Sequence, residues 1–131
     1  MRHPLARWLF LVVLSVTLAL GCRGRDSPSA AGGNLAGRLA AAKGMQNVFE
    51  KDKALAQVAR DAADAGDAAI ADQALAAMQQ VLEKDKAACS AALRLAKVGK
   101  AEAAAATAKV IREIDLKDKT LAKIARGDTS E

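Results

Sequence analysis

Two stretches of the chain decide its fold: KDKALAQVARDAADAG at residues 51–66 and KDKAACSAALRLAKVG at residues 84–99. They lie 33 residues apart, and the Lys-Asp-Lys triplet returns once more at residues 117–119. Three glycines keep the same spacing: Gly33, Gly66 and Gly99. Two apolar columns keep it as well: Met45, Met78 and Ile111 in one, and Val48, Val81 and Ile114 in the other. Self-similarity at a fixed period is the signature of repeat architectures, so the sequence predicts a repeat with a 33-residue period.

The spacing of apolar residues inside each unit is helical. Leu55, Val58, Ala59 and Ala62 stand at i, i+3, i+4 and i+7, which places them on one face of a helix. Gly66 and Gly99 are predicted to be turns between helices, and Asp67 is an acceptable N-cap. The Lys-Asp-Lys triplets are predicted to open helices. The expected helices cover residues 34–49, 51–65, 67–82, 84–98, 100–114 and 117–126.

Composition supports a helical reading and leaves little catalytic chemistry. Of the 131 residues, 52% are apolar and only 2% are aromatic, and alanine is the most frequent residue. This balance favours helix and argues against a β-sandwich or barrel. The only histidine, His3, lies in a segment predicted to be removed, so no imidazole remains for a catalytic triad or a zinc site. We therefore expect no enzyme activity, no cofactor and no metal.

The helix-Gly-helix units resemble tetratricopeptide repeats. The resemblance covers residues 33–126 and rests on small residues where paired helices touch and on the glycine between them: Ala59, Gly66, Ala71, Ala92, Gly99 and Ala104. It implies an all-α fold, a short right-handed α-solenoid of antiparallel helix pairs. The aromatic positions of that family hold Ala or Leu here, so no binding residue is transferred from it.

The N-terminal sequence predicts an export signal. Residues 1–7 carry the charges of Arg2 and Arg7, and the apolar run at residues 8–20 is too short to cross a bilayer as a helix. The run ends in Leu-Ala-Leu-Gly-Cys at residues 18–22, which resembles the lipobox of bacterial lipoproteins. The resemblance implies acylation of Cys22, palmitate included. The alternative is an ordinary cysteine that follows an uncleaved anchor.

The expected domain organisation follows from these features. Residues 1–21 are a lipoprotein signal peptide, residues 22–33 are the lipidated Cys22 and a flexible tether, residues 34–126 are the helical-hairpin repeat domain, and residues 127–131 are a disordered tail. Localisation is then the cell envelope. Because Arg23 is not the Asp that retains such proteins at the inner membrane, the periplasmic face of the outer membrane is favoured in a Gram-negative host.

The recurring lysines are the candidate contact residues. If neighbouring hairpins pack at helix spacing, Lys51, Lys84 and Lys117 form a ladder with steps of about 10 Å that could receive an acidic partner. The alternative is that the triplets are solvated turn residues whose Asp52, Asp85 and Asp118 offset the lysines and cap helices. Neither an acidic cation site nor a reactive thiol is expected: Asp61, Asp64, Asp67 and Asp72 suit caps and solvent, and Cys89 suits helix packing.

Charge and composition also narrow the partner. The formal net charge is +5 and basic residues concentrate in the C-terminal half, but an exported chain so poor in aromatic residues is not expected to bind nucleic acid. The sequence predicts a membrane-anchored envelope lipoprotein whose helical repeats form a protein–protein interaction scaffold for an unknown protein or peptide. The alternative is a structural or spacer lipoprotein that self-associates through Ala-rich helices as a homo-oligomer.

Overall fold

The computed structural model describes residues 34–130, and every regular element in this range is a helix. The prediction of an all-α fold is confirmed for this part of the chain. Cys22 and the rest of the expected signal peptide and tether lie outside the described residues. The six helices are α1 (Leu35–Lys43), α2 (Val48–Asp64), α3 (Ala68–Ala77), α4 (Val81–Lys97), α5 (Ala101–Ala108) and α6 (Ile114–Arg126).

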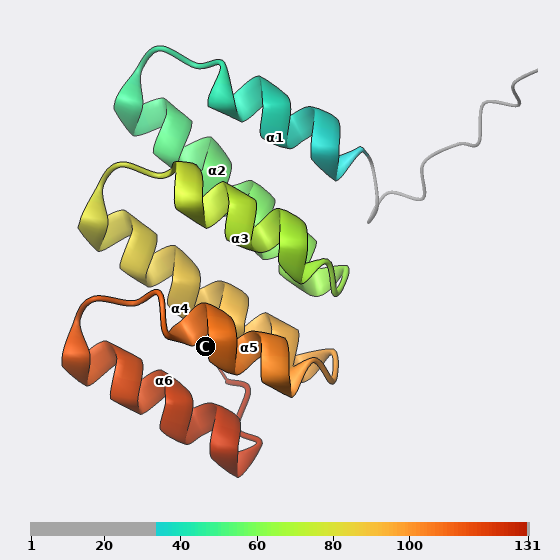
Figure 1. The fold of residues 1–131 in the computed structure, drawn as a ribbon, viewed down its shortest axis with the longest axis vertical. Helices are drawn as coiled ribbons and strands as arrows, with labels where there is room; N and C mark the ends of the chain where they lie inside the picture. Colours follow the sequence, from blue (N-terminus) through green and yellow to red (C-terminus); the bar gives the residue numbers. More distant parts are fainter. Residues whose placement is uncertain (1–33, 131) are drawn as a thin grey trace, which may run out of the picture.

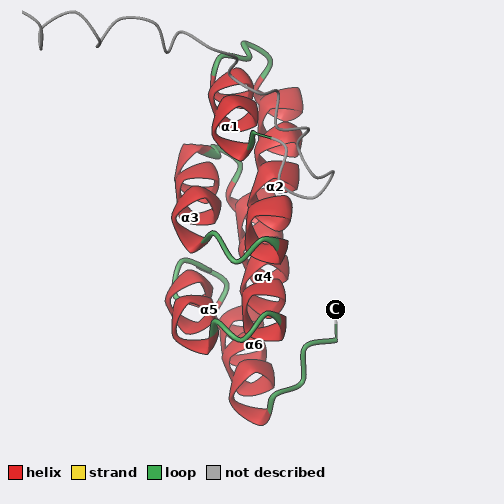
Figure 2. Ribbon diagram, turned by 90° about the vertical axis from the view of Figure 1, so that its right-hand side faces the viewer, coloured by secondary structure: helices red, strands yellow, loops and turns green. Residues whose placement is uncertain are grey.

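The helices lie in two layers, with α1, α3 and α5 in one and α2, α4 and α6 in the other (Figures 1 and 2). Within the second layer α2 packs against α4 and α4 against α6, while α3 and α5 pack against the helices that precede them in the chain. The stack has two ends. One is formed by α1 and α2, and the other by α5 and α6 (Figure 1).

The helix boundaries follow from local capping. Asn47 accepts hydrogen bonds from the backbone N–H groups of Phe49 and Glu50, and Asp67 accepts one from Ile70. The prediction that Asp67 is an N-cap is thereby confirmed. Gly66 and Gly99 have φ of 73° and 81°, in the left-handed region that favours glycine, so both are turns as predicted.

The predicted starts of three helices are wrong. The helices α2, α4 and α6 begin at Val48, Val81 and Ile114, so each Lys-Asp-Lys triplet lies inside a helix and does not open it. The breaks before these helices fall at residues 44–47, 78–80 and 109–113, so α1, α3 and α5 end earlier than the apolar spacing indicated. The reason is that Met78 and Ile111 lie in loops and are nevertheless buried. Their positions continue the apolar spacing of the preceding helix, so the spacing alone assigns them to that helix.

The core is built mainly from alanine. Ala59, Ala62, Ala63, Ala71 and Ala74 are completely buried, and the largest fully buried apolar side chains are Leu55, Leu75, Leu95 and Ile111. An alanine methyl group removes little apolar area from water, so stability depends on close approach of the helices and on high helix propensity. Because the core contributes little stabilising free energy, a substitution that disturbs a turn should lower the stability of the domain measurably.

We predict that Gly66→Ala and Gly99→Ala each destabilise the protein by about 1 to 2 kcal/mol, because a Cβ is disfavoured at positive φ. Steric crowding is not the cause: a Cβ at Gly99 meets nothing within 4 Å, and at Gly66 the nearest atom is 3.7 Å away. The matched control is Gly44→Ala, since Gly44 has φ of −75° and a Cβ there stays 3.5 Å from the nearest atom.

Thermal unfolding followed by circular dichroism measures the effect. The melting temperature should fall for both turn variants and stay level or rise for Gly44→Ala. A rise for the turn variants would contradict the turn geometry.

Candidate binding groove

Two buried carboxylates join each helix of the second layer to the loop before the next one. Asp52, on α2 and 1% exposed, accepts hydrogen bonds from the backbone N–H groups of Gln79 (3.1 Å) and Gln80 (2.7 Å). Both N–H groups precede the first turn of α4, where a negative charge is favoured by the helix dipole. Asp52 therefore anchors the α3–α4 loop on α2.

The same arrangement recurs 33 residues later. Asp85, on α4 and 3% exposed, accepts from the backbone N–H groups of Arg112 (3.1 Å) and Glu113 (3.0 Å), which precede α6. The expectation that Asp52 and Asp85 are solvated turn residues is wrong, because the carboxylates lie under the loop that follows 27 or 28 residues later. They act at the start of the next helix in the layer, not at their own.

The three ladder lysines occupy the same position on α2, α4 and α6. Lys51, Lys84 and Lys117 are all half-buried, and none of them takes part in an ion pair among residues 34–130. The structure brings them into one layer of stacked helices. They do not line the groove described next.

An apolar groove of about 370 Å³ runs between α4 and α6. Leu93, Cys89, Leu116 and Thr120 contribute its apolar lining, and three lysines lie around it: Lys86, Lys119 and Lys123. The thiol of Cys89 is free and half-buried, and the Thr120 hydroxyl lies 3.2 Å from its Sγ while donating a hydrogen bond to the Leu116 carbonyl at 2.7 Å. Cys89 therefore forms part of the groove lining, which agrees with the predicted packing role.

Sequence reasoning missed this groove, although a signal for it exists in the repeat. The corresponding groove between α2 and α4 is lined by Lys53, Arg60 and Glu83 among others, and has a volume of about 270 Å³. Thirty-three residues later, Leu93 stands in the place of Arg60 and Leu116 in the place of Glu83, while Lys86 keeps the lysine of position 53. Two departures from the repeat therefore convert a charged groove into an apolar one with a basic rim.

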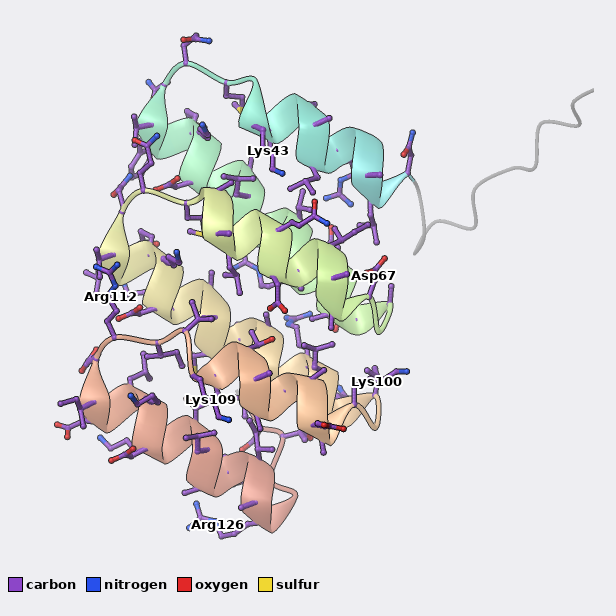
Figure 3. The ribbon with its side chains drawn as sticks, in the orientation of Figure 1. Lys43, Asp67, Lys100, Lys109, Arg112 and Arg126 are labelled. Atoms are coloured by element: carbon purple, nitrogen blue, oxygen red, sulfur yellow. The ribbon has the colours of Figure 1, made fainter. Side chains whose placement is uncertain are left out.

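The edges of the stack carry other charged groups. Asp67 and Lys100 lie at the turns along one edge, and Arg112 lies in a loop on the opposite edge (Figure 3). The acidic residues near the first turn are used separately: Asp61 pairs with Arg38 at 2.6 Å, Asp64 pairs with Arg94, and Asp72 accepts from the Thr107 hydroxyl at 3.0 Å. In residues 34–130 no three His, Cys, Asp or Glu side chains gather as a metal site.

Comparisons with protein families, with curated proteins and with solved structures found no match. Among the helices of the described range, none combines the length and the apolar character needed to cross a membrane. The features that bear on function are therefore the groove, the ends of the stack and the N-terminal sequence.

We predict that Asp52→Asn and Asp85→Asn each lower the free energy of unfolding by about 1.5 to 3 kcal/mol, the usual range for hydrogen bonds to a charged group. An amide oxygen in the place of Oδ2 still accepts from both N–H groups, but the negative charge is lost and the NH₂ group faces the N–H of Gln79 or Arg112. Asp118→Asn serves as the control, because Asp118 holds the same position on α6 and is exposed.

Denaturant titration of the three variants measures the difference. If Asp118→Asn were as destabilising as the other two, the loss would not come from anchoring the loops.

Proposed function

We propose that this chain is a membrane-anchored envelope lipoprotein whose helices act as a protein–protein interaction scaffold, in the form of a short right-handed α-solenoid with a 33-residue period. The observation that carries the proposal is the groove between α4 and α6, where an apolar surface is surrounded by three lysines. Such a surface suits a segment of a partner protein that carries apolar side chains flanked by carboxylates.

The chemistry of the groove supports an amphipathic acidic segment as its ligand. Leu116 is only half-buried and offers apolar area that is removed from water on binding, while Leu93, which is 3% exposed, lines the groove; burial of this apolar area supplies affinity. Lys86, Lys119 and Lys123 are not all available as isolated charges, because Lys86 pairs with Glu83 at 3.1 Å and Lys123 donates to the Ser130 carbonyl at 2.7 Å. Both contacts are exposed and exchange with a stronger carboxylate ligand at little cost.

The membrane anchor belongs to the same proposal and is supported by the lipobox-like sequence that ends at Cys22. Acylation there would hold the helical domain near the envelope surface, with residues 23–33 as the tether. The outer membrane, facing the periplasm, is the proposed site in a Gram-negative host. The second candidate, a self-associating structural lipoprotein, is favoured by the two ends of the stack, which no residue in the range 34–130 covers.

For the anchor, we predict that Cys22→Ser abolishes labelling by a fatty-acid analogue and leaves an unacylated precursor. Cys89→Ser is the matched control and should keep full labelling, because the Cys89 thiol is half-buried among helices and follows no lipobox. Labelling is followed on gels of whole cells. Equal labelling of the Cys22→Ser chain and the unmodified chain would contradict the proposed anchor.

For the groove, we predict that Leu93→Arg combined with Leu116→Glu reduces capture of the partner at least tenfold without unfolding the domain. These substitutions install the residues that stand 33 positions earlier in the α2–α4 groove, where Arg60 and Glu83 are half-buried. Because Leu93 is buried, circular dichroism of the purified variant checks that the domain is still folded. Capture is measured in cells by a photo-crosslinking residue at position 90, which lines the groove.

Two lysine triples of equal charge provide the control. Replacing Lys86, Lys119 and Lys123 by Gln should weaken capture, and replacing Lys51, Lys84 and Lys117 should not, with the difference shrinking as salt rises above about 0.15 M. Equal losses would mean that only net charge matters. If only the replacement of Lys51, Lys84 and Lys117 reduced capture, the partner would contact these lysines and not the groove.

A further inference from the structure

The two ends of the stack expose positions that are buried inside it. At the α1 end, Met45 is 39% exposed, whereas its counterparts Met78 and Ile111 are 5% and 1% exposed. At the α6 end, Ala125 is exposed, although its counterparts Ala59 and Ala92 are completely buried. Each end therefore presents the inner face of a repeat that no described residue covers.

The hydrogen bonding at the two ends is complementary. Asp118 holds the place of Asp52 and Asp85, but it is exposed and its carboxylate has no hydrogen-bond or ion-pair partner in residues 34–130. Gln46 and Asn47 hold the place of Gln79 and Gln80, and the described residues provide no acceptor for their backbone N–H groups. One end lacks the donors that the other end offers.

We propose that a second copy of this chain docks head to tail, with α1 and α2 of the second copy placed against α6 of the first. In this arrangement the carboxylate of Asp118 accepts from the backbone N–H groups of Gln46 and Asn47 of the second copy. The two copies are then offset by three periods. The helix α1 takes the position beside α6 that α3 holds beside α2, and the contact repeats one already made twice within the chain.

Charges along the new junction agree with this placement. In the α2–α4 groove, Lys53 and Arg60 lie on one side with Glu83 on the other. A shift of two periods turns Lys53 and Arg60 into Lys119 and Arg126 of the first copy, and the three-period offset between copies then places Glu50 of the second copy opposite them. Arg126 lies on the edge of α6 that points away from the stack (Figure 3), where the second copy would lie. Opposite charges therefore meet across the junction.

A head-to-tail contact joins two different surfaces, so it leaves a free end on each copy and extends into a chain. This feature makes a complementation test possible. Asp118→Lys disables the α6 end and Met45→Asp disables the α1 end; both positions are exposed in a single copy, so neither substitution should unfold the protein.

The experiment is sedimentation velocity of the full chain in a non-ionic detergent, over a range of protein concentrations. The unmodified chain should form species of increasing size, and each variant alone should associate at least tenfold more weakly. An equimolar mixture of the two variants should recover association, but only as dimers, because one intact α6 end meets one intact α1 end. Glu102→Lys changes an exposed carboxylate on α5 by the same charge and should associate like the unmodified chain.

Two outcomes would overturn the proposal. One is an unmodified chain that stays monomeric at every concentration, and the other is a mixture of variants that associates no better than either alone, as an interface between identical surfaces would.

A photo-crosslinking residue at position 45 identifies the occupant directly, using a mixture of isotopically distinct copies. Crosslinks to residues 114–126 of the other copy support the junction. Crosslinks to residues 1–33 of the same chain, or to α1 and α2 of the other copy, contradict it. The Leu93→Arg and Leu116→Glu chain changes the groove but none of the residues placed at the junction, so it should give the same crosslinks and the two proposals fail independently.

Discussion

The hydrogen bonds from a buried carboxylate to two successive backbone N–H groups hold the stacked helices in register. Asp52 and Asp85 each reach across to the loop before the next helix of the layer, where two backbone N–H groups satisfy the buried carboxylate. Each carboxylate also lies at the start of that helix, where the aligned peptide dipoles favour negative charge. Shifting one helix along its neighbour would leave a buried charge and two donors unpaired.

The alanine-rich core explains why such anchoring is needed. Methyl groups allow the helices to approach closely, but they interlock less than larger side chains and define the register of two helices weakly. The few large buried residues, Leu55, Leu75, Leu95 and Ile111, lie on different helices or, for Ile111, in a loop. Directional hydrogen bonds therefore add the specificity that apolar packing alone supplies poorly. In residues 34–130 no buried side-chain nitrogen or oxygen lacks a hydrogen-bond partner.

The groove and the ends of the stack are the two surfaces proposed for binding, and they arise in different ways. The groove arises where the repeat is broken, because Leu93 and Leu116 replace charged residues of the preceding unit. The ends arise where the described helices stop. Asp118 keeps the carboxylate of an internal junction without the N–H donors, and the Gln46–Asn47 loop keeps the N–H donors without the carboxylate, among the described residues. The first feature suits an acidic amphipathic segment of a partner protein. The second suits a further copy of the same chain.

The sequence by itself determined the helical class, the two glycine turns and the Asp67 cap, because these depend on composition and on contacts between residues close in the chain. It also shows which residues recur every 33 positions. The apolar spacing assigns Met78 and Ile111 to helices, whereas both are buried loop residues. Only the tertiary structure decided where α2, α4 and α6 begin and what the aspartates do. The partners of Asp52 and Asp85 are 27 and 28 residues away, and no local pattern reports a contact at that distance.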